Sequence, residues 1–258
     1  MLLGIDHLVI AVPDPDAAAA ELEGALGLVA TGGGRHETSG THNRLVFLGD
    51  AYLELIGAWD RSLALAHPIG AAVVRALDGG APGLVTWALA TDGVRREVAT
   101  LRAAGSPISD AIAGTRTRPD GAVVAWQCAF PPTLAPAEPP FLIEHELAGP
   151  EWGDEARRAR ARFVHPFGGT ARLVGLELAV PDPATVARSW ERAVGVVLPP
   201  GAGAVPGERE GRVGDHGIRL VPAPSAAAGG APAARVGIAG TAGPHALADL
   251  FGVRFARL

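Results

Sequence analysis

Residues 8 to 28 read LVIAVPDPDAAAAELEGALGL, and a near copy, LELAVPDPATVARSWERAVGV, begins at Leu176. In both stretches an apolar, strand-like segment runs into Pro-Asp-Pro and then into a helical segment that ends at Gly27 or Gly195. An aspartate before a helix caps its free N–H groups, and glycine suits the left-handed residue that ends a helix. The sequence therefore predicts the same strand–helix unit twice.

A weaker copy, GLVTWALATDGVRREVATLRAAG, begins at Gly83. The aligned aspartates Asp14, Asp92 and Asp182 give a period of roughly 80 to 90 residues, which is too long for a solenoid repeat. Alternating apolar segments bounded by glycine-rich turns follow the helices and predict further strands. These strand candidates are 29–35, 43–48 and 51–57 in the first copy, 114–118, 122–130 and 141–146 in the second, and 213–223 in the third.

The predicted order in each unit is β-α-β-β-β, which makes the chain an α+β protein of repeated modules. We expect residues 1–149 to form one domain of two paired modules and residues 150–170 to form a linker. Residues 171–258 then hold a degenerate third module and a fourth that stops early, built from ARVGIAG, PHALADLFG and VRFARL.

The composition limits the classes of function that the chain can have. With 48% hydrophobic and 19% charged residues the chain is globular, and a net charge of −5 argues against a nucleic-acid or anionic-membrane surface. All 22 basic residues are arginine, which excludes Schiff-base chemistry on a lysine. Cys128 is the only cysteine, so neither an intrachain disulfide nor a cysteine-rich zinc site can form. With no secretory leader or membrane-length apolar segment visible, we expect a cytoplasmic protein, monomeric or homodimeric, whose partner is a small molecule.

The module order, together with GIDHLVIAVPD and GTHNRLVFLGDAYLELIG, resembles the vicinal oxygen chelate (VOC) superfamily, and most closely its glyoxalase-like branch. That superfamily includes glyoxalase I, the extradiol dioxygenases and the bleomycin-resistance proteins. The resemblance spans nearly the whole chain for the fold but is specific in motif only over about the first 150 residues. It implies that paired modules curl their mixed sheets into a cup, with helices outside, and that the cup holds a divalent metal or a ligand.

Strand alternation places His7 on one face of its strand and Glu54 on one face of another. The faces comprise Ile5, His7, Val9 and Ala11 in the first strand and Tyr52, Glu54 and Ile56 in the other. A buried carboxylate is costly unless it is paired or metal-bound. The pattern would also be explained if His7 were a hydrogen-bonded core histidine and Glu54 lay on a solvent-exposed strand.

The resemblance implies a metal site, because His7 and Glu54 fall where relatives carry ligands. In the second module Glu144 aligns with Glu54, whereas Val85 aligns with His7 and supplies no ligand. The implied set is therefore His7, Glu54 and Glu144, which suits zinc, manganese, nickel or iron but lacks the second histidine of an extradiol dioxygenase. The third module carries Gly175 and Arg219 at these positions and has lost the ligands.

Other polar and aromatic residues are weaker candidates. His36 and His42 lie in the glycine-rich stretch GGGRHETSGTHN, where either could contact substrate or metal or be merely solvated. Thr41 and Asn43 could position a ligand or hold the loop. By alternation from Glu144, His145 should face the outer helices or solvent. Trp87 and Trp126 could line the cup or pack in the core.

The leading hypothesis is a metal-dependent enzyme that chelates a small oxygenated substrate and moves a proton on it, as a lyase or isomerase of the glyoxalase type does. Glu54 or Glu144 would be the proton-transfer residue. The alternative is a binding protein of the bleomycin-resistance kind, in which the same cup sequesters a small molecule without metal or turnover. The missing ligand at Val85 favours this alternative, and the intact set of His7, Glu54 and Glu144 disfavours it.

Overall fold

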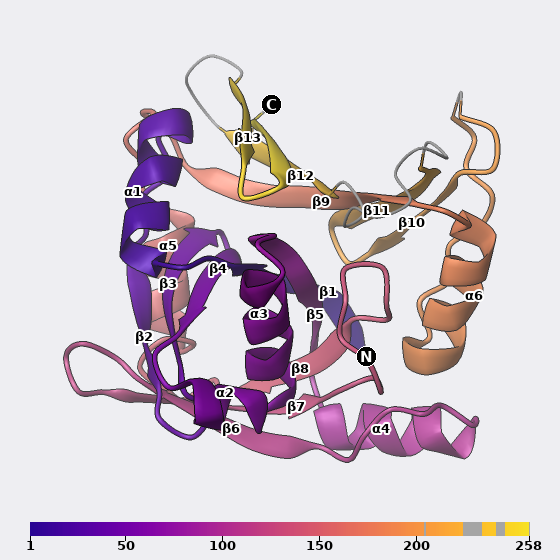
Figure 1. The fold of residues 1–258 in the computed structure, drawn as a ribbon, viewed down its shortest axis with the longest axis horizontal. Helices are drawn as coiled ribbons and strands as arrows, with labels where there is room; N and C mark the ends of the chain where they lie inside the picture. The colour runs from indigo at the N-terminus through magenta and orange to yellow at the C-terminus, as the bar shows by residue number, and fades with distance from the viewer. Residues whose placement is uncertain (204, 224–233, 241–245, 258) are drawn as a thin grey trace.

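The computed structural model describes residues 1–203, 205–223, 234–240 and 246–257 (Figure 1). The first module comprises β1 (Leu2–Ala11), α1 (Pro15–Leu26), β2 (Gly32–His36), β3 (Thr41–Leu48) and β4 (Ala51–Ala58). The second comprises β5 (Gly83–Thr91), α4 (Val94–Ala103), β6 (Ile112–Thr117), β7 (Val123–Ala129) and β8 (Phe141–His145). Two helices, α2 (Arg61–Leu65) and α3 (Pro68–Asp78), lie between the modules. This confirms the predicted order β-α-β-β-β for both modules.

The repeated Pro-Asp-Pro motif works as a helix start. The Asp14 carboxylate accepts hydrogen bonds from the backbone N–H groups of Asp16 and Ala17 at 2.9 and 3.1 Å. Gly27 then ends α1 with a φ of 65°, a conformation that favours glycine. The copy around Asp182 caps its helix in the same way.

The two modules close into one eight-stranded barrel with the order β1-β4-β3-β2-β6-β7-β8-β5. β1 runs parallel to β4 of its own module and antiparallel to β5 of the other, so it joins the modules over its whole length. On the opposite side β2 meets β6 through the single residue pair Arg35 and Thr117. The barrel therefore has one extensive seam and one short seam.

The rest of the chain forms a second sheet with the order β10-β11-β9-β12-β14-β13. Its elements are α5 (Asp154–Ala161), which precedes the sheet, then β9 (Ala171–Val180), α6 (Pro183–Val194), β10 (Arg209–Val213), β11 (His216–Pro222), β12 (Ala234–Gly240), β13 (Ala246–Leu250) and β14 (Val253–Arg257). β9 pairs parallel with β11 and antiparallel with β12, which repeats the pairing of β1 with β4 and β5. Arg219, which the sequence aligns with Glu54, is paired with Glu177 at 2.9 Å.

One continuous apolar core joins the outside of the barrel to the second sheet, which lies across the barrel in Figure 1. Trp87 of β5 is fully buried in this core and meets Trp190 of α6 edge to face, with ring centroids 5.1 Å apart. A smaller apolar cluster that includes Val9 and Ala11 fills part of the barrel interior. Within the described residues, no helix has both the length and the apolar character needed to cross a membrane.

The face of β1 differs from the prediction at its first residue. Val9 and Ala11 belong to the cluster inside the barrel, but Ile5 packs in the outer core with Leu8. The pairing of β1 with β5 shifts register between Ile5 and His7. A one-residue irregularity of this kind reverses the faces on either side of it, so Ile5 points outward while His7 points inward.

Candidate functional site

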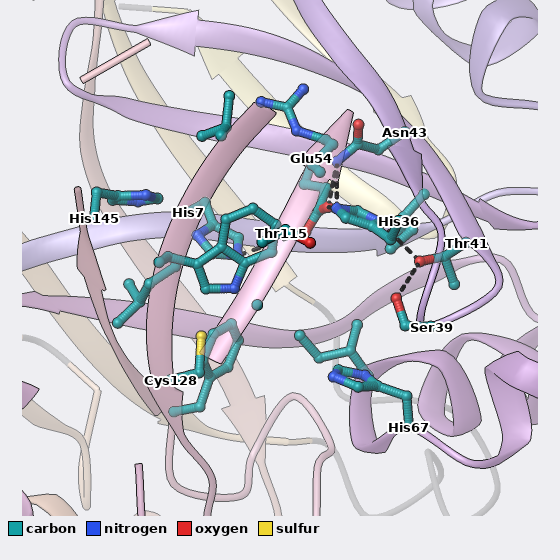
Figure 2. Close-up of a pocket in the computed structure, with 18 of the residues that line it drawn as sticks. His7, His36, Ser39, Thr41, Asn43, Glu54, His67, Thr115, Cys128 and His145 are labelled. Carbon is teal, nitrogen blue, oxygen red and sulfur yellow. Dashed lines mark hydrogen bonds and ion pairs between the residues drawn. The ribbon is translucent and has the colours of Figure 1, made fainter. Parts of the chain in front are cut away.

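The barrel encloses a cavity of about 110 Å³ that both modules line. Figure 2 shows His7, Glu54 and His36 gathered near its middle, with His145 and His67 on opposite sides. The volume is below the roughly 300–1,000 Å³ of sites for drug-sized ligands, so the enclosed part of a ligand must be small. The cavity thus contains most of the polar side chains that the first module buries, together with Arg116 of the second.

His7 is held by its neighbour in the chain. Its Nδ1 lies 2.6 Å from Oδ1 of Asp6, whose side chain is 3% exposed. Asp6 also contacts His145, with Nε2 at 3.0 and 3.1 Å from the two carboxylate oxygens. Burial alone would raise the pKa of Asp6, but the charge of His145 and the hydrogen bonds from both histidines outweigh it and hold that pKa well below its usual range. Asp6 is therefore a carboxylate that fixes two imidazoles.

Glu54 lies beside His7 in the cavity. Its Oε2 lies 3.5 Å from Nε2 of His7, and its Oε1 accepts a hydrogen bond from Nδ2 of Asn43 at 2.6 Å. The Glu54 side chain is 7% exposed, and the Tyr52 ring stacks on His7 with centroids 4.5 Å apart. Because 3.5 Å exceeds the length of a good hydrogen bond, Oε2 remains available to a ligand.

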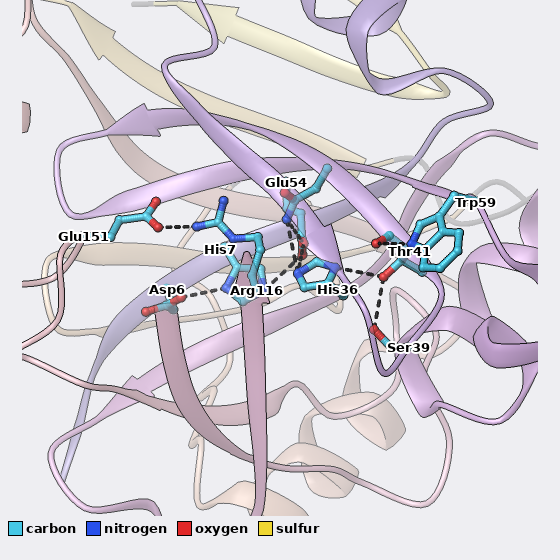
Figure 3. Close-up of polar contacts among 10 residues, drawn as sticks. Asp6, His7, His36, Ser39, Thr41, Glu54, Trp59, Arg116 and Glu151 are labelled. Carbon is cyan, nitrogen blue, oxygen red and sulfur yellow. Dashed lines mark hydrogen bonds and ion pairs between the residues drawn. The ribbon is translucent and has the colours of Figure 1, made fainter. Parts of the chain in front are cut away.

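His36 joins this row from β2 (Figure 3). Its Nδ1 bonds Thr41 Oγ1 at 2.8 Å, and its Nε2 lies 3.9 Å from Oε1 of Glu54. Burial lowers the pKa of His36 to about 4, against the opposing attraction of Glu54. His36 is therefore a neutral imidazole at neutral pH and forms part of the cavity wall, so it is not a solvated loop residue. Thr41 holds it there, and Asn43 holds Glu54.

Glu144 does not join His7 and Glu54, contrary to the set that the resemblance implied. Its Oε2 accepts a hydrogen bond from the backbone N–H of Val94 at 2.9 Å, which places it outside the barrel at the start of α4. Its cross-strand partner, Gln127, bonds Arg95 on the same outer side. Aligning FLIEHE with YLELIG without a shift sets Ile143, not Glu144, against Glu54. A shift of one residue moves a strand's side chains to the opposite face.

The same shift brings His145 inside, where we had expected it to face outward. Phe141, Ile143 and His145 line the cavity at every second position of β8. The His145 ring stacks on Trp152 with centroids 3.8 Å apart, and Trp152 lies in the segment predicted to be a linker. Alternation counted from the apolar residues Phe141 and Ile143 would have identified His145 from the sequence.

Two further candidates do not line the cavity. Trp87 faces the second sheet, because a register shift in the pairing of β1 with β5 between Val9 and Ile10 separates its face from that of Val85. His42 alternates with the buried Thr41 and Asn43 and so points out of the barrel. Trp126 does line the cavity and meets His36 edge to face at 5.7 Å.

Sequence reasoning missed Arg116 of β6. Its side chain is 4% exposed and lines the cavity, and its Nη2 donates to Oε2 of Glu151, a residue of the predicted linker. The Glu151 side chain is 6% exposed, so this is a buried ion pair. A single arginine in a short strand carries no distinguishing pattern, and only closure of the barrel places it beside the first module.

The donor set does not fit the metal site that the resemblance implied. His7 and Glu54 could serve as two ligands, but Glu144 lies outside the barrel, and Val85 and Ala88 give β5 an apolar inner face. Throughout the described parts of the chain, no three side chains of His, Cys, Asp or Glu come together in a way that could hold a metal ion.

A family model described as "Glyoxalase-like domain" matches residues 5–194, and no curated protein matches the chain. A hypothetical protein from Staphylococcus aureus shares the fold over 100% of both chains, with a TM-score of 0.76 and 15% identity. A methylmalonyl-CoA epimerase variant from Streptomyces coelicolor matches 58% of this chain and 99% of its own, with a TM-score of 0.44 and 20% identity. The corresponding Mycobacterium tuberculosis epimerase matches 55% and 87%, with a TM-score of 0.41 and 20% identity. At 15% identity the first likeness shows the fold alone.

Proposed function

Because the chain belongs to the glyoxalase-like domain family of the VOC superfamily, we propose that it is an enzyme of the lyase or isomerase type. It would bind a small oxygenated organic molecule in the barrel cavity and move a proton on a carbon next to a carbonyl group. The observation that supports this most is the buried Glu54 carboxylate, which has one oxygen fixed by Asn43 and the other 3.5 Å from His7.

The hydrogen bonds suggest how the proton moves. A carboxylate only accepts hydrogen bonds, so the short contact with Asp6 assigns a proton to Nδ1 of His7. With its proton on Nδ1, a neutral His7 has only an acceptor at Nε2, and this atom faces the acceptor Oε2 of Glu54 at 3.5 Å. A proton placed between the two acceptors would hydrogen-bond them. Glu54 can therefore take a proton from substrate and pass it to His7, or return it to carbon. Asp6 orients the His7 ring through this contact.

Exchange of a carbon-bound hydrogen with solvent tests this chemistry. We expect the protein to catalyse deuterium incorporation from D2O into dihydroxyacetone or pyruvate, followed by proton NMR. Glu54→Gln should slow the exchange by about 100-fold or more, since general acid–base catalysis contributes roughly 10²–10⁴-fold. The matched control is Glu144→Gln, which makes the same chemical change outside the barrel and should leave the rate unchanged. Wild-type protein at the background rate, or full activity in Glu54→Gln, would contradict the proposal.

A metal remains the alternative form of this proposal, with His7 and Glu54 as its ligands. Incubation with zinc, manganese, nickel or iron, followed by gel filtration and elemental analysis, measures it directly. Stoichiometric metal in the wild type that is lost in His7→Ala and kept in Glu144→Gln would support a two-ligand site. Loss in Glu144→Gln would instead restore the three-ligand set and contradict the placement of Glu144.

The competing function is sequestration of a small molecule without turnover. The apolar inner face of β5 and the aromatic walls formed by Trp126, Phe130 and Phe141 favour it. In that case a ligand would bind with the stoichiometry of one per chain while the exchange rate stayed at the background in both the wild type and Glu54→Gln.

A further inference from the structure

One end of the Arg116 guanidinium group is a hydrogen-bond donor without a partner in the described part of the chain. Its Nη2 is taken by Glu151, but its Nη1 is buried and has no hydrogen-bond partner among the residues that the structure describes. A buried guanidinium N–H without a partner is costly, and such groups in folded proteins need an explanation, often a water, an ion or a ligand. Arg116 lines the cavity, so that partner can be a molecule bound there.

The field of Arg116 reaches the row of residues around Glu54. Its charge contributes to lowering the pKa of His36, after burial, and opposes the increase that burial causes in the pKa of Tyr52. Figure 3 shows Arg116 extending to Glu151, with His7 and Glu54 nearby. No ion pair links Arg116 to Glu54 in the described part of the chain, so the cation is not already neutralised by the proposed base.

Glu151 explains why Arg116 stays in place without a ligand. The ion pair offsets the guanidinium charge and holds the planar group in one orientation. The contact engages Nη2 and leaves Nη1 free to donate to a ligand. A preorganised cationic donor in a closed cavity interacts more strongly with a developing negative charge than it would in water. Glu151 is thus a positioning residue for Arg116.

We propose that Arg116 binds the substrate oxygen that becomes negatively charged during the reaction. This deepens the proposed function and rests on it for the chemical step. Glu54 takes the proton from the carbon, the electrons of the broken C–H bond form a C=C bond, and the carbonyl π electrons move to oxygen. The resulting enolate oxygen accepts a hydrogen bond from Nη1 of Arg116. Return of a proton to the opposite face of that carbon completes an isomerisation, and loss of a leaving group from the neighbouring carbon completes an elimination.

The proposal names a ligand class that can be tested without turnover. Glycolate carries a carboxylate beside a hydroxyl group, and glycolamide has nearly the same shape without the charge. We expect NMR titration of the full chain to show that glycolate binds at least 10-fold more tightly than glycolamide. Arg116→Gln combined with Glu151→Gln removes both charges of the buried pair and should abolish this preference. The double variant also avoids the unpaired buried charge that would destabilise Arg116→Gln alone.

Arg157→Gln is the matched control. Arg157 pairs with Asp50 at 2.6 Å on the exposed surface and does not line the cavity, so its loss should leave the preference for glycolate unchanged. Glu54→Gln removes a like charge and should bind glycolate at least as tightly as the wild type. Equal binding of glycolate and glycolamide by the wild type, or a retained preference in the folded double variant, would overturn the proposal. Failure of deuterium exchange with an intact glycolate preference would instead refute only the proposed reaction.

Discussion

Replacing Asp6 by Asn tests the geometry on which the site depends. The structure buries Asp6 between two imidazoles, 2.6 Å from Nδ1 of His7 and 3.0 Å from Nε2 of His145. Hydrogen bonds to a charged group contribute about 1.5–3 kcal/mol each. Asparagine retains one acceptor oxygen but loses the charge and turns an NH2 group toward the second imidazole. We therefore expect Asp6→Asn to lower the free energy of unfolding by about 2–4 kcal/mol at pH 7.

The pH dependence of this effect follows from the direction of the pKa shift. The folded-state pKa of Asp6 lies well below its unfolded-state pKa of about 3.9. Its contribution to the free energy of unfolding is therefore fully present at pH values above that unfolded-state pKa. It is lost as the pH falls through the folded-state pKa. The difference between wild type and Asp6→Asn should therefore persist from pH 7 to pH 5 and narrow only below about pH 4.

Urea denaturation followed by far-ultraviolet circular dichroism measures both quantities, given a two-state transition. Asp92→Asn is the control, because Asp92 pairs with Arg96 at 2.7 Å on the exposed surface. Its unfolding midpoint should match that of the wild type. An Asp6→Asn protein within about 0.5 kcal/mol of the wild type would refute the burial of the Asp6 carboxylate between His7 and His145.

Two further predictions concern the cavity wall and the core. Because the pKa of His36 falls to about 4 on folding, the unfolded chain alone takes up a proton between about pH 6.5 and 4. Wild-type stability should thus fall as the pH drops through that window, by at most about 3 kcal/mol, and His36→Gln should flatten the curve in urea titrations. Trp87→Ala should lower the free energy of unfolding by about 3–5 kcal/mol, because the ring is fully buried against Trp190. Thermal unfolding would measure this loss. A Trp87→Ala protein that melts like the wild type would place the ring outside the core.

The arrangement of Asp6, His7, Glu54 and Arg116 combines contributions from both modules. The first module supplies His7 and Glu54, the proposed proton-transfer residues, and the second supplies His145 and Arg116. The short seam between β2 and β6 brings Arg116 near His36, although the two strands share only one residue pair. The proposed chemistry thus needs the closed barrel, because neither module alone contains the base, the imidazole that supports it and the oxyanion-binding residue.

The sequence by itself determined the modules, and the resemblance implied that His7 and Glu54 lie together, as the structure places them at 3.5 Å. Capping aspartates and terminal glycines act locally, and alternation within a regular strand is visible in the letters. The division at residues 149 and 170 and the cytoplasmic location stay predictions. Only the tertiary structure decided that the Asp6 side chain is buried between His7 and His145. Alternation counted from Phe141 and Ile143 could have placed His145 inward and Glu144 outward from the sequence alone. A register shift of one residue reverses the face of a strand while leaving its composition unchanged. Arg116 and Glu151 became neighbours only through barrel closure, since contacts between residues distant in sequence depend on the packing of whole strands and not on any local pattern.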